Sequence, residues 1–273
     1  MTEMINENVK PGTLSICPAG EVFALPGEED YKQEWKRLQG LVREQRLLGR
    51  EIVVVMGIGY VGAVMAGVIA DSINRDTREP TKFVIAMQRP SPRSYWKIPY
   101  LNRGIAPVEA EDPEVAPLIR RCVHEKKTLT ATFSYDALML ADVVVVDIQC
   151  DYHKEILGNV RQGRADIAAL EDCLKIIGQK ITKDCLVLIE TTVPPGTTEY
   201  VAYPIIKKAF EKRGFNNAEP ILAHSFERVM PGREYVASIR DFWRVCSGIN
   251  ETARERVKKF LSEIINVEQY ALT

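Results

Sequence analysis

The chain lacks the features that mark membrane-bound, secreted or nucleic-acid-binding proteins. No apolar run approaches the roughly 18 residues that a transmembrane helix needs. The N-terminal residues lack the basic and then apolar order of a secretion signal. Neither charge is in excess, because 36 Lys and Arg stand against 37 Asp and Glu, and this balance argues against a general nucleic-acid or membrane-surface binder. These absences predict a cytoplasmic protein.

The sequence also lacks the cysteine and histidine patterns that are typical of metal sites and of disulfide frameworks. The 273 residues hold six cysteines and three histidines, without a CxxC pair or a close His/Cys group. Zinc sites need such groups, and disulfide frameworks are rare in cytoplasmic chains of this size. We therefore predict free thiols packed as small apolar side chains, and no metal site.

Residues 1–50 are predicted to form a leader that precedes the main domain. Pro-Gly breakers in residues 1–27 indicate irregular chain. After them Tyr31, Trp35, Leu38 and Val42 recur at helical spacing. We expect an amphipathic helix that packs on the domain formed by residues 51–273.

From residue 51 onward, short apolar runs alternate with helical stretches. The expected strands are 52–56, 83–87, 128–132, 143–148, 186–190, 221–223 and 244–247, and the expected helices are 61–74, 113–124, 135–140, 165–180, 199–213 and 251–265. A run such as Val143–Val146 suits a strand covered on both faces. The alternation predicts an α/β fold, a Rossmann-like, doubly wound, mainly parallel sheet with helices on both faces.

The sharpest motif is Gly57-Ile58-Gly59-Tyr60-Val61-Gly62, which follows the first strand of this region and opens a helix. In a dinucleotide-binding turn Gly57 permits the tight bend, Gly59 lets the pyrophosphate approach the backbone, and Gly62 lets the helix pack close to the strand. The helix N-terminus then offers free N–H groups to the phosphates. A tight strand-to-helix turn without a ligand is the alternative.

The next strand lacks the acidic residue that would bind the adenosine ribose. Gln88 and Arg89 follow it instead. Gln88 has the groups to hydrogen-bond a ribose, and Arg89 suits a 2′-phosphate or the adenine ring, unless it is only a solvated loop charge. This departure leaves NAD favoured as cofactor and NADP open.

Two later segments, taken with the glycine turn, resemble the UDP-glucose/GDP-mannose dehydrogenase family of nucleotide-sugar 6-dehydrogenases. They are Glu190-Thr191-Thr192-Val193-Pro194-Pro195-Gly196-Thr197-Thr198-Glu199 and His224-Ser225-Phe226-Glu227-Arg228-Val229-Met230-Pro231-Gly232. The match spans roughly residues 51–270 in the family's order and spacing. The resemblance implies two Rossmann-like domains, and oxidation of the C6 alcohol of a UDP-sugar to a carboxylate with two NAD.

The resemblance also implies roles for particular residues. Thr192 matches a threonine that helps to position a water near the reacting carbon, and we also expect it at the cofactor. Glu227 matches a glutamate assigned to proton transfer or to ordering that water, and Arg228 is a candidate substrate contact. Without the resemblance, Thr192 reads as a strand-end hydroxyl and Glu227 as a surface carboxylate. The Glu-Arg-Val-Met-Pro-Gly form is closer to the branch that oxidises UDP-N-acetylhexosamines.

The family's oxyanion-binding lysine and asparagine and its nucleophilic-cysteine segment have no counterpart here. Cys150 is the cysteine expected near the cofactor, and its acidic neighbours disfavour a reactive thiolate. We therefore expect the cofactor-binding half of such an enzyme, without the cysteine-bearing domain and inactive alone. Dimerisation is left open, because the family dimer uses a central helix. The alternatives are a non-catalytic dinucleotide-binding or sensing module and, against the motifs, a Rossmann-type methyltransferase.

Overall fold

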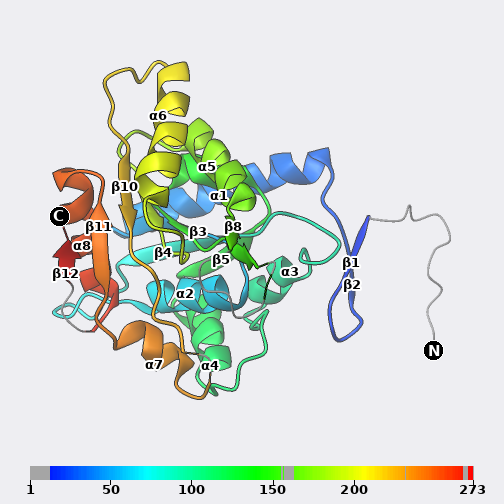
Figure 1. Cartoon of the computed structure of the whole chain (residues 1–273). Helices are drawn as coiled ribbons and strands as arrows, with labels where there is room; N and C mark the ends of the chain where they lie inside the picture. The colour runs from blue at the N-terminus through cyan, green and yellow to red at the C-terminus, as the bar shows by residue number, and fades with distance from the viewer. Residues whose placement is uncertain (1–12, 155, 157–162, 231, 267–269, 273) are drawn as a thin grey trace, which may run out of the picture.

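The apolar strands assemble into one eight-stranded sheet in the computed structural model, which describes residues 13–154, 156, 163–230, 232–266 and 270–272 (Figure 1). The strand order is β12-β11-β10-β9-β6-β3-β4-β5. The strands are β3 (Glu51–Met56), β4 (Lys82–Met87), β5 (Leu129–Thr132), β6 (Val143–Val146), β9 (Leu186–Ile189), β10 (Ile221–His224), β11 (Val245–Gly248) and β12 (Tyr270–Leu272). Neighbours run parallel except β10 and β11, which pair antiparallel. The mainly parallel doubly wound fold is confirmed.

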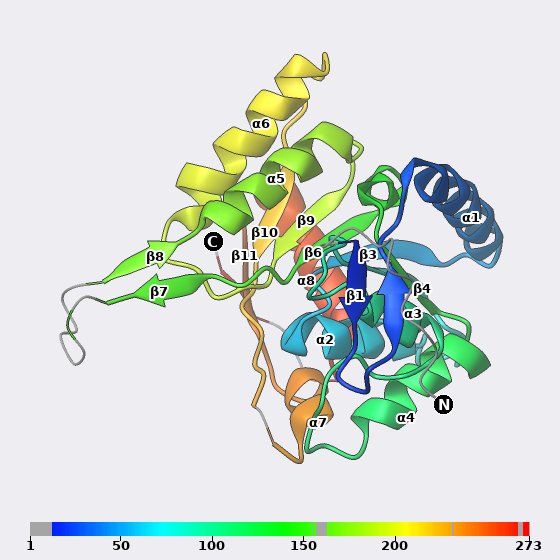
Figure 2. The same ribbon diagram turned by 90° about the vertical axis from the view of Figure 1, so that its right-hand side faces the viewer.

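Helices cover both faces of the sheet (Figure 2). Because side chains alternate along a strand, Val53 and Val55 face one layer while Ile52, Val54 and Met56 face the other. The first layer holds α2 (Tyr60–Asp71), α3 (Lys97–Asn102), α4 (Val115–Arg120), α7 (Tyr235–Arg240) and α8 (Glu251–Ile264). The second holds α1 (Glu28–Leu47), α5 (Ala168–Lys180), α6 (Tyr203–Lys212) and a 3₁₀ turn at Tyr135–Leu140. Burial on both faces explains the continuous apolar runs.

The strand order places a reversal at the centre of the sheet. Chain order runs outward from β3 through β4 to β5, and then from β6 through β9 to β10 on the other side of β3. In open α/β sheets, ligands bind outside the carboxyl ends of the strands at such a switch point. The segments that follow β3 and β6 therefore define where a ligand is expected.

The leader is more ordered than its breakers indicate. Where irregular chain was expected, β1 (Leu14–Ile16) and β2 (Val22–Ala24) form an antiparallel hairpin. The hairpin is held against α3, since Ser15 accepts a hydrogen bond from the Trp96 amide. The prediction of a packed helix is confirmed, because Leu38 and Val42 of α1 lie in the core. Residues 1–12 of the leader lie outside the described residues.

Several predicted helices differ from the structure in type or in extent. Residues 135–140 form a 3₁₀ turn capped by Ser134, and 113–124 is split into α4 and a π-helical turn at Arg121–Glu125. The helix expected from 199 begins with a π-helical turn at Thr197–Ala202, because Pro204 has no N–H for a normal helical bond. No helix in the described ranges is long and apolar enough to cross a membrane.

The helix expected over 165–180 begins only at Ala168. Before it, β8 (Arg164–Asp166) pairs antiparallel with β7 (Asp151–His153) in a hairpin that projects from the sheet (Figure 2). The Asp166 carboxylate accepts a hydrogen bond from the Ala168 amide at the start of α5. This bond lies between the end of the hairpin and the first residue of the helix.

Candidate functional site

The three glycines of the turn after β3 have three different environments. Gly57 has φ +104°, and a Cβ there would lie 2.5 Å from the carbonyl oxygen of Asp147. A Cβ on Gly62 would overlap the carbonyl oxygen of Gly57. A Cβ on Gly59 would meet nothing within 4 Å. Two glycines are therefore required by packing, while the third leaves open space beside the backbone.

That open space lies at the positive end of α2. The helix begins at Tyr60 with Gly59 as its N-cap, and the first N–H groups of a helix have no intrahelical acceptor. Together with the helix dipole, they favour an anion next to the backbone. A dinucleotide diphosphate fits this cradle, since the side chain that would fill the space is missing at Gly59.

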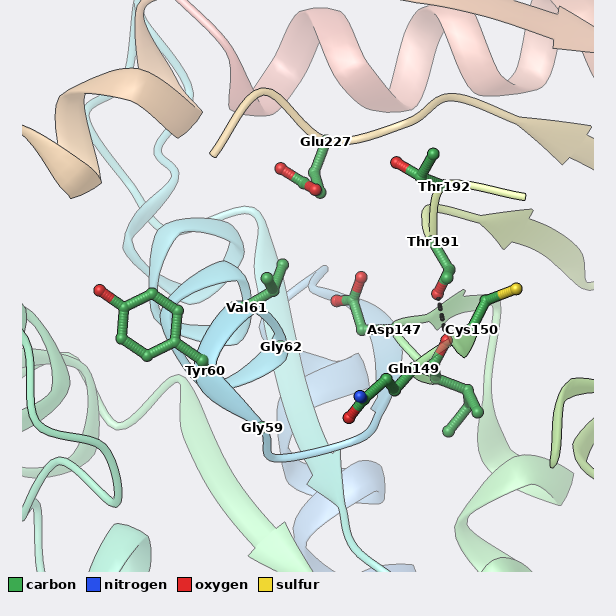
Figure 3. A pocket seen from close by; sticks show the side chains of 11 residues that line it. Gly59, Tyr60, Val61, Gly62, Asp147, Gln149, Cys150, Thr191, Thr192 and Glu227 are labelled. Carbon is green, nitrogen blue, oxygen red and sulfur yellow. Dashed lines mark hydrogen bonds between the residues drawn. The ribbon is translucent and has the colours of Figure 1, made fainter. Parts of the chain in front are cut away.

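A cleft of about 340 Å³ opens next to the turn (Figure 3). It is lined by Gly59, Tyr60, Val61, Gly62, Asp147, Ile148, Gln149, Cys150, Thr191, Thr192 and Glu227. Asp147 follows β6, Thr192 follows β9 and Glu227 follows β10, so carboxyl ends of three strands meet the glycine turn. Figure 3 shows the carboxyl groups of Asp147 and Glu227 and the hydroxyl of Thr192 around one space.

Thr191 links the segment after β9 to the segment after β6 by hydrogen bonds. Its hydroxyl donates to the carbonyl oxygen of Val146 at 3.2 Å and to that of Ile148 at 2.7 Å. The Glu227 amide donates to the carbonyl oxygen of Glu190, and the Glu227 carboxylate accepts from the Val229 amide. These bonds hold the segments after β6, β9 and β10 in a common position.

A second hollow, of about 660 Å³, lies at the carboxyl end of β4 and includes Gly57, Gln88 and Arg89 in its wall. The Gln88 amide is already engaged, because its oxygen accepts from the Ile58 amide at 2.9 Å and its nitrogen donates to Ser94 at 3.3 Å. Gln88 thus supports the glycine turn as well as lining the hollow.

Two residues predicted for the site lie apart from the cleft walls. Ile58 is fully buried in the core beneath the turn. Arg228 lies with its guanidinium 5.1 Å from the ring of Trp243 and 5.7 Å from that of Phe226. The predicted residues Gly59, Tyr60, Val61, Gly62, Thr192 and Glu227 come together, and Gly57, Gln88 and Arg89 line the adjoining hollow.

Sequence reasoning missed a buried charge cluster beneath the cleft. Glu190 and Arg244 are both fully buried and form an ion pair. Burial, together with the nearby Glu190 carboxylate, raises the pKa of Asp147 well above its ordinary value. Burial also raises the pKa of Glu190, although Arg244 opposes it. The expected strand 143–148 enclosed Asp147, and an acid next to the apolar run Val143–Val146 was the available signal.

Cys150 lines the cleft but is not activated. Burial and the charges of Asp151 and Asp166 raise the pKa of its thiol, and the thiolate is the nucleophilic form of cysteine. Among the described residues, no three His, Cys, Asp or Glu side chains are grouped so that they would hold a metal ion.

The geometry of turn, cleft and strand order agrees with the comparisons to known proteins. The model of the UDP-glucose/GDP-mannose dehydrogenase family, NAD binding domain, matches residues 51–265. The chain belongs to this family. Its matched segment begins at β3, so the leader hairpin and α1 lie outside it.

Known members of the family are distant but consistent relatives. UDP-N-acetyl-D-glucosamine 6-dehydrogenase of Pseudomonas aeruginosa is 29% identical over 218 residues, which are 78% of this chain and 43% of that protein. UDP-N-acetyl-D-mannosamine dehydrogenase of Pyrococcus horikoshii is 24% identical over 217 residues, 78% of this chain and 44% of that one. The chain spans less than half the length of these relatives.

The solved structure of NDP-N-acetyl-D-galactosaminuronic acid dehydrogenase from Methanosarcina mazei superposes with a TM-score of 0.71 at 30% identity. The superposition covers 86% of this chain and 46% of that one. A GDP-mannose dehydrogenase from Pseudomonas aeruginosa gives a TM-score of 0.65 at 20% identity, which supports the fold alone.

Proposed function

We propose that this chain binds NAD across the carboxyl ends of β3 and β6 and is the cofactor-binding half of a nucleotide-sugar 6-dehydrogenase. The observation that carries the proposal is the space beside Gly59, at the N-terminus of α2 and open to a cleft that Thr192 and Glu227 also line. The diphosphate would lie against the amides of Tyr60 and Val61. The adenosine would lie in the hollow beside Gln88 and Arg89.

Thr192 and Glu227 are the proposed polar groups that would hold and deprotonate the reacting hydroxyl. NAD, when bound, supplies the hydride acceptor for oxidation of an alcohol. The Thr192 hydroxyl and the Glu227 carboxylate flank the same space and would hold a water or a substrate hydroxyl between them. A carboxylate in that position acts as a general base on a hydroxyl within hydrogen-bond reach.

The substrate we propose is a UDP-sugar, of the UDP-N-acetylhexosamine class. The Glu-Arg-Val-Met-Pro-Gly segment supports this class, and two relatives are named for UDP-N-acetylmannosamine and UDP-N-acetylglucosamine. Arg228 is positioned by two aromatic rings near Glu227 and is the proposed contact to the substrate.

Turnover by the chain alone is not expected. Conversion to a carboxylate in this family passes through a cysteine, and Cys150, with its raised pKa, is the cysteine that lines the cleft. We therefore propose that oxidation requires a second domain that supplies the nucleophile.

Calorimetric titration with NAD, NADP and UDP-N-acetylglucosamine, followed by an assay for NADH, tests these proposals. We expect dinucleotide binding, weak sugar-nucleotide binding and no NADH. Absence of dinucleotide binding would overturn the function, and sustained NADH formation would overturn the need for a second domain. Dinucleotide binding that is unchanged when a complementing cysteine-bearing domain is added, still with no turnover, would favour a non-catalytic sensing module.

The choice between NAD and NADP is tested at Arg89. We propose NAD, in line with the family, although the wall of the hollow contains Arg89 and Lys175. Arg89→Ala should leave NAD affinity within about threefold, since a solvated charge contributes little. Arg93→Ala, an exposed arginine in the same loop, is the matched control. Preferential binding of NADP that Arg89→Ala abolishes would reverse the assignment, because a 2′-phosphate needs this cation.

A further inference from the structure

Three carboxyl groups and one arginine converge beneath the cleft. Asp147, Glu190 and Glu227 follow three neighbouring strands, and Arg244 immediately precedes β11. Arg244 contacts one oxygen of Glu190. The other oxygen, Oε2 of Glu190, and Oδ2 of Asp147 are both enclosed and have no hydrogen-bond partner among the described residues.

One proton on Asp147 would allow a hydrogen bond between the two enclosed carboxyl oxygens. An ionised carboxylate only accepts hydrogen bonds, so two enclosed carboxylates cannot bond to each other. With one proton, Asp147 donates to Glu190, and Glu190 stays ionised against Arg244. Such a hydrogen bond between the two side chains adds to burial and to the charges of Glu190 and Glu227 in raising the pKa of Asp147. Like carboxyl groups that share a site do not ionise together.

Asp147 also touches the dinucleotide cradle. Its Cβ lies 3.2 Å from the position of a Cβ on Gly62, and its carbonyl oxygen lies against Gly57. Its side chain is therefore next to the N-terminus of α2, where a negative group is favoured. An ionised Asp147 would compete with the diphosphate for this positive end and would repel it.

The groups around Asp147 are mostly acidic, and the one cation among those that act on its pKa, Arg244, is already paired with Glu190. Glu190 faces it from the end of β9, Glu227 from the end of β10 and Arg244 from the start of β11. Tyr60 of α2 and Tyr235 of α7 lie stacked at the same end of the cleft. Burial raises the pKa of Tyr235, so it remains neutral.

We propose that Asp147 is a positioning residue that carries a proton shared with Glu190, and that this singly protonated pair, with Asp147 neutral, is the form that admits the dinucleotide diphosphate. The proposal rests on the proposed function, because it concerns the same cleft. It predicts that a dinucleotide binds less tightly as the shared proton is lost.

The test follows the proton and the affinity on the same protein. Carboxyl carbon NMR of the whole chain, with Asp147 assigned from the spectrum of Asp147→Asn, reports whether Asp147 is protonated at neutral pH. Calorimetric titration with NAD over the same pH series reports the affinity. We expect a protonated Asp147, and an affinity that falls by up to about tenfold per pH unit above its titration midpoint.

Variants separate the proton from the fold. Asp147→Asn keeps a neutral donor, and its NAD affinity should be flat with pH and within about threefold of the low-pH value, since the hydrogen bond is retained. Asp151→Asn, an exposed acid in β7, is the control and should keep the pH dependence of the unmodified protein. An ionised Asp147 at neutral pH, or an affinity that stays constant through its titration, would overturn the inference. Absence of NAD binding at every pH would instead overturn the proposed function.

Discussion

Buried acidic side chains are compensated differently at the two ends of the parallel strands, called here the amino edge and the carboxyl edge of the sheet. At the amino edge, Glu51 of β3 is paired with Lys82 of β4 and with Arg256 of α8, and these cations lower its pKa. At the carboxyl edge, Asp147 and Glu190 share the single cation of Arg244, and both pKa values are raised.

The difference indicates which edge is built for a ligand. Lys82 also contacts Glu263, so the amino edge is a compensated network that holds β3, β4 and α8 together. Each enclosed polar atom without a partner costs about 1–3 kcal/mol. With both groups ionised, the carboxyl edge would bear that cost at Asp147 and Glu190, next to the cleft, and a shared proton removes it. Under-compensated buried charge of this kind is characteristic of functional sites.

The largest effect should come from removing Arg244, the fully buried arginine that pairs with Glu190 at the carboxyl edge. Arg244→Met leaves Glu190 buried beside Asp147 without its cation and should lower the free energy of unfolding by about 3–5 kcal/mol. Urea denaturation at neutral pH measures this loss. Lys82→Met at the amino edge should cost less, because Arg256 still pairs with Glu51. Glu190→Gln added to Arg244→Met should restore part of the loss, and equal losses at the two edges would contradict the comparison.

Two glycine variants then separate the packing role of the glycine turn at the carboxyl edge from its role in binding the cofactor. Gly62→Ala places a Cβ against the carbonyl oxygen of Gly57 and should destabilise the fold by about 1–3 kcal/mol, as overpacking does. Gly59→Ala meets open space with extended backbone, and should change stability by less than about 0.5 kcal/mol. The same variant should weaken NAD binding at least about tenfold, since its methyl group enters the space of the diphosphate.

Thermal unfolding and NAD titration of both proteins separate the two roles. A stable Gly59→Ala variant with unchanged NAD affinity would show that the diphosphate does not approach this turn. An unaltered melting temperature for Gly62→Ala would contradict the close helix–strand contact.

The smallest effect is in the pH dependence of stability, where the edges should have opposite signs. Because the pKa of Glu51 is lowered in the folded protein, Glu51 stabilises the fold at pH values above its pKa in the unfolded chain. This stability is lost as pH falls through the folded pKa. The raised pKa of Asp147 favours the fold at low pH, and this advantage is lost as pH rises from the unfolded pKa toward the folded one. Each effect should be on the order of 1 kcal/mol.

Denaturation at a series of pH values measures both limbs. Glu51→Gln should flatten the loss of stability in acid, and Asp147→Asn should reduce the decline as pH rises. If both variants changed the dependence of unfolding free energy on pH in the same direction, the proposed difference between the two edges would be wrong.

Strands and the glycine turn were predictable because their signals are local. The continuous apolar run Val143–Val146 needs no partner to be recognised as a buried strand. The turn from Gly57 to Gly62 is read from glycine spacing after a strand and before a helix. The same locality misplaced the helix around residue 200, because Pro204 changes the hydrogen bonding of the turn before it.

Elements that depend on distant contacts were missed. The β1–β2 hairpin is held by Ser15 at the Trp96 amide and by Phe23 packed edge-on against Tyr100, partners that lie far along the chain. Three-residue strands carry too little periodic pattern to be recognised without those partners.

The amino-acid sequence alone determined the central strands β3–β6 and β9–β11, the glycine turn and the family, because these depend on hydrophobic periodicity and on motifs within short segments. The tertiary structure decided the charge state of the cleft. Asp147, Glu190, Glu227 and Arg244 belong to four separate segments, and a carboxyl group's affinity for a proton depends on which charges the fold brings beside it and on how far it excludes water.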